Sequence, residues 1–431
     1  MGLAVRDARV HVRRGGMTNL GHARAVDRRW PSGEVGTAAR PMQGAQMKVA
    51  FYAPLNAPDA PVPSGDRLIA RMLVRALGDA GADVQVASRL RSLDMTGDRE
   101  RQRRIERIGT AQAQRLLRRY GGPGAWRPDL WLTYHLYHKA PDWIGPAVAT
   151  ALGIPYAVGE AMFKKKHAAG PWAEGLAAVA RALRRADLVL GLKPGDEGAV
   201  KKHLRAEAVY EAITPFLDTA PFARAHARRG ELRRELAARH GLDAGAPWLL
   251  AVGMMREGSK LASYRALGEA LARLGERRFQ VLAAGDGPAR GDVEHALRCA
   301  GGRARLLGCL EGEALAGYYA ASDLFVWPAI KEPIGMVFLE AQAAGLPVVA
   351  GDRPGVGSVV ERDRTALLPP EGDVAAFADA VGALLDAPAR RAAMGEAALA
   401  FVRERHDVRT AGASFAARLF AFAAAHPRGR G

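Results

Sequence analysis

The sequence predicts an α/β protein made of two successive halves, each a parallel β-sheet with helices on both faces. In the first half, short apolar runs alternate with stretches of helical periodicity, and we expect strands at 48–53, 83–87, 129–133, 154–158, 187–190 and 208–213. A second alternating set starts at 248–252, after an extended, Pro-containing segment at 213–218 that suits a link between domains. The length of 431 residues also favours two or three domains.

The composition is that of a globular protein, with 49% hydrophobic and 25% charged residues. No apolar run approaches the roughly 18 residues of a membrane-spanning helix, and residues 1–30 lack the apolar segment of a secretory signal. Two cysteines are too few for a disulfide scaffold or a zinc site. Cys299 and Cys309 both lie in apolar or glycine-rich surroundings, so we expect them to be buried thiols in a reducing compartment. Together these features predict a cytoplasmic protein.

The net charge of +17 leaves nucleic acid, anionic lipid and anionic substrates open as reasons for the basic character. Most of the basic residues are Arg spread along predicted helices, which favours an Arg-rich solvated surface. Residues 99–119 concentrate eight Arg, with a weak apolar face from Ile105, Ile108 and Leu116. This segment is either a solvated helix or a helix that rests on an anionic membrane leaflet.

We expect residues 1–46 to be a disordered leader, or an upstream translation artefact, because they show no sustained period of 2 or 3.6. A first domain then covers 47–215, and its first strand ends in a Pro-rich loop before Gly65, which should open the next helix. His135 and Glu160 are expected just after the third and fourth strands. Ligands bind outside the carboxyl ends of such strands, so both side chains are candidates to face a cleft between the domains.

The second domain is expected over 216–405, followed by a C-terminal helix and tail over 406–431. After the strand at 248–252, Arg256 and Lys260 should lie at a strand end and a helix start, where two cations suit a diphosphate. Glycines follow the next two strands, at Gly285 and Gly308. The glycine-rich connection at 351–373 leads into an Ala-rich helical tail.

The organising stretch is Lys331–Ala350, KEPIGMVFLEAQAAGLPVVA. We predict a helix with Pro333 in its first position, which places Glu332 at the cap, although Glu is a poor N-cap. The free N–H groups of the first turn would then form a cradle for an anion or hydroxyl. Glu332 and Glu340 would lie far enough apart to hold hydroxyls at two ends of an extended ligand, such as a nucleotide-sugar. The alternative is an ordinary helix with two solvated acids.

This E-x7-E stretch closely resembles the donor-site motif of retaining GT-B glycosyltransferases, the GT4-like family also called glycosyltransferase group 1. The resemblance extends over roughly residues 48–400 and is strongest from residue 251. It implies a GT-B fold, two Rossmann-like domains facing across a cleft. It also implies that Glu332 lies beside the transferred sugar, that Glu340 binds the donor ribose, and that Gly285 and Pro288 belong to a GxGP turn.

The residues that this resemblance assigns to the donor are Gly65, Arg256, Lys260, Gly285, Gly308, Leu310, Glu332, Ile334, Gly335, Met336, Val337 and Glu340. The catalytic candidates are Glu332, Arg256, Lys260, His135 and Glu160. The family often has a His at the position of Glu160, and this departure puts a His-based role there in doubt. The spacing of Arg256 and Lys260 from the preceding glycine also differs from the family.

The expected function is transfer of a sugar from a UDP- or GDP-sugar to a lipid or glycan acceptor, with retention of configuration, in cell-envelope glycan or glycolipid synthesis. We expect no metal, because the donor-site segments contain no Asp-x-Asp motif, and no cofactor, because the nucleotide-sugar is a substrate. The protein is expected in the cytoplasm or on the inner face of the cytoplasmic membrane, with no nucleic-acid partner. Two alternatives stay open: an epimerase or phosphorylase of the same fold, and a basic nucleic-acid-binding module.

Overall fold

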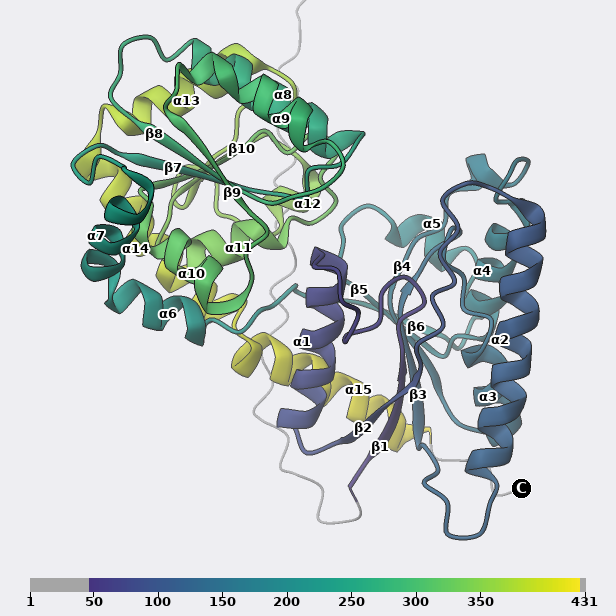
Figure 1. The fold of residues 1–431 in the computed structure, drawn as a ribbon. Helices are drawn as coiled ribbons and strands as arrows, with labels where there is room; N and C mark the ends of the chain where they lie inside the picture. The colour runs from purple at the N-terminus through teal and green to yellow at the C-terminus, as the bar shows by residue number, and fades with distance from the viewer. Residues whose placement is uncertain (1–45, 427–431) are drawn as a thin grey trace, which may run out of the picture. The chain divides into compact units, whose positions relative to one another are not determined.

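The computed structural model describes residues 46–426, so the predicted leader at 1–46 lies outside the described residues except for its last residue. The described chain forms two six-stranded sheets whose strands are all parallel (Figure 1). The alternation of apolar runs and helical stretches predicted this α/β class correctly.

The first sheet has the strand order β2-β1-β3-β4-β5-β6. Its strands are β1 Lys48–Tyr52, β2 Asp83–Ser88, β3 Leu130–Leu136, β4 Tyr156–Ala161, β5 Leu188–Gly191 and β6 Val209–Ala212. Its helices are α1 Gly65–Asp79, α2 Arg99–Tyr120, α3 Gly145–Leu152, α4 Ala173–Arg185 and α5 Glu197–Lys201. Gly65 opens α1 as predicted, and the Ser64 side chain caps that helix by accepting from the Arg67 N–H at 3.1 Å.

Alternate residues of β1 pack on opposite faces of the first sheet. Val49 and Phe51 belong to the core on the side of α1, whereas Ala50 and Tyr52 pack with residues of α2, α3 and α4. This period of two is what a strand buried on both faces requires. Figure 1 shows the same layers, with α1 and the C-terminal helix on one face and α2, α3 and α4 on the other.

The second sheet has the order β12-β11-β10-β7-β8-β9. Its strands are β7 Trp248–Val252, β8 Gln280–Ala284, β9 Ala304–Gly308, β10 Leu324–Trp327, β11 Val348–Ala350 and β12 Ala366–Leu367. The helices that follow in the chain are α6 Ala220–Ala227, α7 Arg229–His240, α8 Ser259–Ala272, α9 Arg290–Leu297, α10 Gly312–Ala321, α11 Met336–Ala343, α12 Pro354–Gly357, α13 Val374–Leu385, α14 Pro388–Arg405 and α15 Ala413–Ala425.

Each sheet has one point where the order of connections reverses, between β1 and β3 in the first sheet and between β7 and β10 in the second. Loops that leave neighbouring strands in opposite directions open a crevice at such a switch point, and ligands of doubly wound sheets bind there. The topology therefore directs attention to the segments that follow β1, β3, β7 and β10.

Two connecting segments run beside each other near the predicted domain boundaries. The Leu217 N–H donates to the His406 carbonyl (2.9 Å), and the Val408 N–H donates to the Leu217 carbonyl (2.8 Å). The C-terminal helix α15 then packs on α1, with the rings of Phe216 and Phe415 5.9 Å apart. The exact boundaries at 215 and 405 stay predictions.

Three local predictions were wrong. Cys299 and Cys309 are exposed rather than buried, because they lie in a short 3-10 turn and in the loop after β9. His135 and Glu160 lie within β3 and β4 rather than after them, since pairing of these strands continues to Leu136 and Ala161. The third is the start of α11, which begins at Met336 and not at Pro333.

Candidate donor site

The segments after β7 and β10 bring Lys260 and Glu332 into direct contact. Lys260 is the second residue of α8, and its Nζ lies 2.6 Å from Glu332 Oε2. The Trp327 indole N–H, at the end of β10, donates to the same carboxylate oxygen at 3.3 Å. The side chains of Lys260 and Glu332 are only 15% and 9% exposed. The pair is thus a largely desolvated polar contact at the switch point of the second sheet.

The helix after Glu332 begins later than its sequence suggests. α11 starts at Met336, and Gly335 precedes it in the left-handed conformation with φ 77°. The Phe338 N–H donates to the Gly335 carbonyl at 2.9 Å, and a Cβ at residue 335 would lie 2.3 Å from the Phe338 ring. Glu332 is therefore not the N-cap and Pro333 is not the first helical residue, because only the glycine at 335 can make the turn that starts the helix.

The corrected start still leaves an N–H cradle at the predicted place. Among the described residues, no backbone or side-chain acceptor contacts the N–H groups of Ile334, Gly335, Met336 and Val337. Ile334 and Met336 are buried, at 8% and 4% exposure, so these amides are fixed by the packing of their side chains. Free amides at a helix N-terminus suit phosphate or hydroxyl oxygens.

Glu340 lies further along α11 and contacts a buried tyrosine. The Tyr319 hydroxyl, from α10, donates to Glu340 Oε2 at 2.8 Å. Burial raises the pKa of Glu340, and the Tyr319 hydrogen bond offsets this only in part. Sequence reasoning missed Tyr319, since the pair is separated by 21 residues and has no local signature.

Arg256 lies in the loop between β7 and α8, exposed and without an ion-pair partner in residues 46–426. The loop itself is held by the turn after β8. The Met255 N–H donates to the Asp286 carbonyl, and the Ala289 N–H donates to the Met255 carbonyl, both at 2.9 Å. The structure thus fixes the backbone beside Arg256, whose side chain is exposed.

The predicted glycines after β8 and β9 support that loop. Gly285 has φ 145°, and a Cβ there would lie 1.9 Å from the Gly253 carbonyl oxygen. The Gly285 N–H donates to the Gly308 carbonyl at 2.8 Å, so the two turns contact each other. Leu310 follows half-buried, just before α10. The direct role of Gly285 in this structure is to let three loops pack closely.

At the carboxyl edge of the first sheet, His135 and Glu160 are neighbours on adjacent strands. The His135 Nδ1–H donates to Asp66 Oδ1 at 3.0 Å, while His135 Nε2 and Asp66 Oδ2 are buried and have no hydrogen-bond partner within residues 46–426. Burial lowers the pKa of His135, but its hydrogen bond to Asp66 and the nearby carboxylates outweigh this, and the pKa is raised. Asp66 was not singled out from the sequence, because it is 69 residues from His135.

The Glu160 carboxylate accepts hydrogen bonds from the backbone around it. Its Oε2 accepts from the N–H groups of Leu192 (2.6 Å) and Lys193 (3.0 Å), which follow β5. Burial raises the pKa of Glu160, and the charge of His135 acts against that rise. Glu160 adopts φ 64°, which non-glycine residues rarely do. The structure places Glu160 beside His135 but turns one carboxylate oxygen towards the backbone rather than a ligand.

Two contacts link the first sheet's loops to the second sheet's segments. A Cβ at Gly65 would lie 4.0 Å from Met336 Cγ, so the start of α1 is close to the start of α11. Arg67 forms an ion pair with Glu311, the residue before α10. Gly65 is therefore close to the start of α11, and its role in donor binding stays a prediction.

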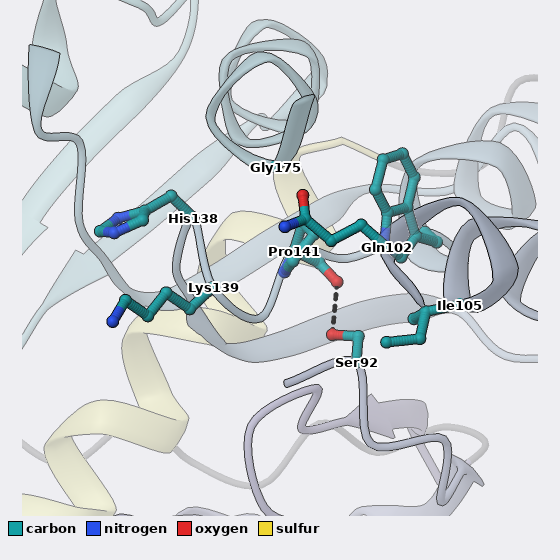
Figure 2. Close-up of a pocket in the computed structure, with 8 residues that line it drawn as sticks. Ser92, Gln102, Ile105, His138, Lys139, Pro141 and Gly175 are labelled. Carbon is teal, nitrogen blue, oxygen red and sulfur yellow. Dashed lines mark hydrogen bonds between the residues drawn. The ribbon is translucent and has the colours of Figure 1, made fainter. Parts of the chain in front are cut away.

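A separate small pocket lies beside α2 (Figure 2). Ser92 and Gln102 line it together with His138, and Ser92 Oγ donates to the Pro141 carbonyl at 2.7 Å. The residues that line it include none of the predicted donor or catalytic residues.

No group of three or more His, Cys, Asp or Glu within residues 46–426 is placed to hold a metal ion. In that same range, no helix is both long and apolar enough to cross a membrane.

Comparison with known proteins identifies the second half. Residues 246–387 match the family model described as "Glycosyl transferases group 1". The chain is 34% identical to an alpha-D-kanosaminyltransferase of Streptomyces kanamyceticus, over 56% of this chain and 61% of that protein. It is 32% identical to a 2-deoxystreptamine N-acetyl-D-glucosaminyltransferase of Streptomyces fradiae, over 62% and 65%. The match thus covers less than two thirds of either relative.

Solved structures show the same fold over most of the chain. A sucrose-phosphate synthase from Thermosynechococcus elongatus superposes with a TM-score of 0.69 at 22% identity, covering 88% of this chain and 100% of that one. Anabaena HepE in complex with UDP-glucose gives a TM-score of 0.64 at 18% identity, covering 87% and 100%. Residues 246–387 therefore belong to the glycosyl transferases group 1 family, in a chain that has the GT-B fold.

Proposed function

We propose that the protein is a glycosyltransferase that moves a sugar from a nucleotide-sugar to an acceptor with retention of configuration at the sugar. The observation that carries this proposal is the desolvated contact of Lys260 with Glu332, 2.6 Å apart, beside the free amides that precede and open α11. A cation, hydrogen-bond donors and a carboxylate in one place suit a ligand that joins a diphosphate to a sugar.

Each group has a separate role in this proposal. Arg256, Lys260 and the amides at the start of α11 stabilise the negative charge that grows on the diphosphate as the glycosidic bond breaks. Glu332 accepts hydrogen bonds from hydroxyls of the transferred sugar. Glu340 accepts hydrogen bonds from the ribose. Because protein cations and amides can meet the diphosphate charge, we expect turnover without a metal ion.

The donor in this proposal is a UDP- or GDP-sugar. HepE, which shares the fold, was solved with UDP-glucose. A mannosyltransferase of Corynebacterium glutamicum that is 40% identical over 105 residues is named GDP-mannose-dependent. These names support testing both nucleotides and do not distinguish between them.

The acceptor in this proposal binds at the carboxyl edge of the first sheet. Asp66 Oδ2 and His135 Nε2 are buried there and have no partner in the described part of the chain, and both suit hydroxyl groups. The relatives' names include aminocyclitol and phosphatidylinositol mannoside acceptors. We keep a lipid or glycan acceptor, and a role in cell-envelope glycan or glycolipid synthesis, as the working hypothesis, with aminocyclitols as the competing acceptors in the assay.

A peripheral position on the inner face of the cytoplasmic membrane fits such a lipid acceptor. All eight Arg of α2 are exposed, whereas Gln102, Ile105, Gly109, Ala113, Leu116 and Tyr120 form the buried face of the helix. Two exposed apolar side chains, Met95 and Ile108, lie just before and within α2. A cationic face with apolar side chains suits an anionic lipid surface.

The test is a donor screen with the purified full chain. UDP-glucose, UDP-N-acetylglucosamine and GDP-mannose are offered with and without EDTA, and both melting temperature and release of nucleoside diphosphate are measured. We expect one donor to raise the melting temperature and to be hydrolysed slowly, unaffected by EDTA. An isotope-labelled donor then separates transfer from epimerisation or phosphorolysis through its products. The absence of binding and hydrolysis for every donor would contradict the proposal.

A further inference from the structure

Tyr319 holds one oxygen of Glu340 from within the core. The tyrosine is completely buried, and its ring packs near Phe222 and Phe325, with ring centroids 5.8 Å apart in each case. Its hydroxyl donates to Glu340 Oε2 at 2.8 Å. Because the ring is fixed by aromatic neighbours, the position of this hydroxyl is fixed too, and so is the carboxylate oxygen that accepts from it.

The second oxygen of Glu340 is left for a ligand. Glu340 Oε1 has no hydrogen-bond partner among residues 46–426, and Glu340 is only partly buried. A carboxylate anchored through one oxygen presents the other in a defined direction. Without the anchor, rotation about the last side-chain torsion, which is broad for Glu, would spread the free oxygen over many positions.

Tyr319 also connects two parts of the candidate site. It lies near the end of α10, and the segment that leads into α10 contains Gly308 and Leu310, both assigned above to the donor. One short helix thus joins the turn after β9 to the carboxylate on α11.

We infer that Tyr319 is a positioning residue, which orients Glu340 so that its free oxygen accepts hydrogen bonds from the ribose hydroxyls of the donor nucleotide. This inference rests on the proposed function, because it requires that Glu340 contacts a ribose. Tyr319 itself touches no ligand in this account. The substitution Tyr319→Phe removes the hydroxyl and keeps the buried ring, so it should disturb the direction of Glu340 more than the core.

The neighbouring tyrosine provides a matched control. Tyr318 is also buried, at 5% exposure, and its hydroxyl contacts His240 Nε2 at 2.7 Å, away from Glu340. Tyr318→Phe therefore removes a hydrogen bond of similar length from the same turn of the same helix. Any effect on ligand binding that arises only from loosening α10 should appear in both variants.

The experiment is calorimetry with whichever of UDP and GDP the wild type binds more tightly, and with the 2′,3′-dideoxy form of the same nucleotide. We expect Tyr319→Phe to weaken binding of the ribonucleotide about tenfold, because the free Glu340 oxygen is then no longer held in place to accept from the ribose hydroxyls. A tenfold loss corresponds to about one hydrogen bond to a charged group. It should leave binding of the dideoxynucleotide within about twofold of the wild type. Tyr318→Phe should preserve the wild-type preference for the ribonucleotide. In a Glu340→Gln background, Tyr319→Phe should have little further effect.

Each comparison of two ligands is internal to one variant, so partial unfolding of a variant cannot imitate the expected result. A Tyr319→Phe protein that keeps the wild-type preference for the ribonucleotide, while Glu340→Gln loses it, would overturn the role of Tyr319 and leave the proposed function intact. An equal loss of the ribonucleotide preference in Tyr319→Phe and Tyr318→Phe would assign the effect to α10 as a whole and overturn the specific role of Tyr319. Failure of the wild type to bind either nucleotide would contradict the proposed function and, with it, this inference.

Discussion

Removal of Lys260 should destabilise the protein through the carboxylate that it leaves behind. Lys260 and Glu332 have 15% and 9% exposed side chains, so the pair is close to the buried limit. Breaking a buried pair by removing one partner costs about 3–5 kcal/mol, whereas exposed pairs contribute about 0–1 kcal/mol. In this variant we expect the Trp327 N–H, which donates to Glu332 in the wild type, to keep that hydrogen bond. We therefore expect Lys260→Met to lower the free energy of unfolding by about 2–4 kcal/mol.

The double variant separates pairing from packing. Glu332→Gln keeps a neutral acceptor for Lys260 and should cost no more than about 1.5–3 kcal/mol, the range for a hydrogen bond to a charged group. Lys260→Met with Glu332→Gln leaves no buried unpaired charge, so its loss should be smaller than the sum of the single losses by at least about 1 kcal/mol. Urea titrations of the four proteins, followed by circular dichroism, measure this coupling.

An exposed pair of the same length serves as the control. Lys201 Nζ lies 2.6 Å from Glu197, but both side chains are about half exposed, at 52% and 50%. Lys201→Met should therefore cost less than about 1 kcal/mol. The argument from desolvation is refuted if Lys260→Met lowers the free energy of unfolding no more than Lys201→Met does. It is also refuted if the free-energy losses of Lys260→Met and Glu332→Gln simply add in the double variant.

Three further outcomes are expected. Gly285→Ala should lower the free energy of unfolding by at least about 3 kcal/mol in urea titrations, because the new methyl group meets a carbonyl oxygen of the loop after β7 at a strained φ. The free energy of unfolding should fall as the pH drops from about 6.5 towards 4, because burial lowers the pKa of His406 to about 4 while the side chain of the unfolded protein protonates near its ordinary value. In urea titrations, His406→Asn should flatten this pH dependence, whereas the control His295→Gln, at an exposed histidine, should not. The full chain should sediment with anionic but not with neutral vesicles, and this binding should weaken in high salt or when Arg104→Glu and Arg107→Glu are combined. Equal binding to both kinds of vesicle would count against a membrane role for α2.

The fold was predictable because the central strands of both sheets are buried on two faces, which produces nearly continuous apolar runs in β1, β3, β7, β8 and β10. Strand ends were less predictable for a physical reason. His135 and Glu160 interrupt the apolar pattern, yet the ladder between β3 and β4 continues past them to Leu136 and Ala161. Polar residues with a candidate functional role thus interrupt the apolar run before the strand ends, which makes the strand end hard to predict from the sequence.

The start of α11 illustrates a second limit. Pro333 fits the preference for proline at the first helical position, but the left-handed Gly335 decides where the helix begins. The pattern of residues contained both signals, and only the packing of Phe338 against Gly335 shows which one prevails.

The membership of the site was only partly predictable. The E-x7-E spacing pointed to Glu332 and Glu340, but their contacts are long-range, with Lys260 lying 72 residues from Glu332 in the chain. Neither Tyr319 nor Asp66 carries a local signal, because each acts through a partner on another element. Such positioning residues become visible only when the tertiary contacts are known.

The assignment of different roles to the two glutamates is tested most directly by binding and turnover in the same pair of variants. Calorimetry with the nucleoside diphosphate product, and turnover of the donor found in the screen, are measured for Glu332→Ala and Glu340→Ala. We expect Glu340→Ala to weaken nucleotide binding and to raise KM more than it lowers kcat, because a ribose contact is made before and during the reaction alike. We expect Glu332→Ala to bind the nucleoside diphosphate almost as the wild type does, since that product lacks the sugar, and to lose turnover. If both variants keep wild-type donor binding and turnover, the donor site proposed here is contradicted.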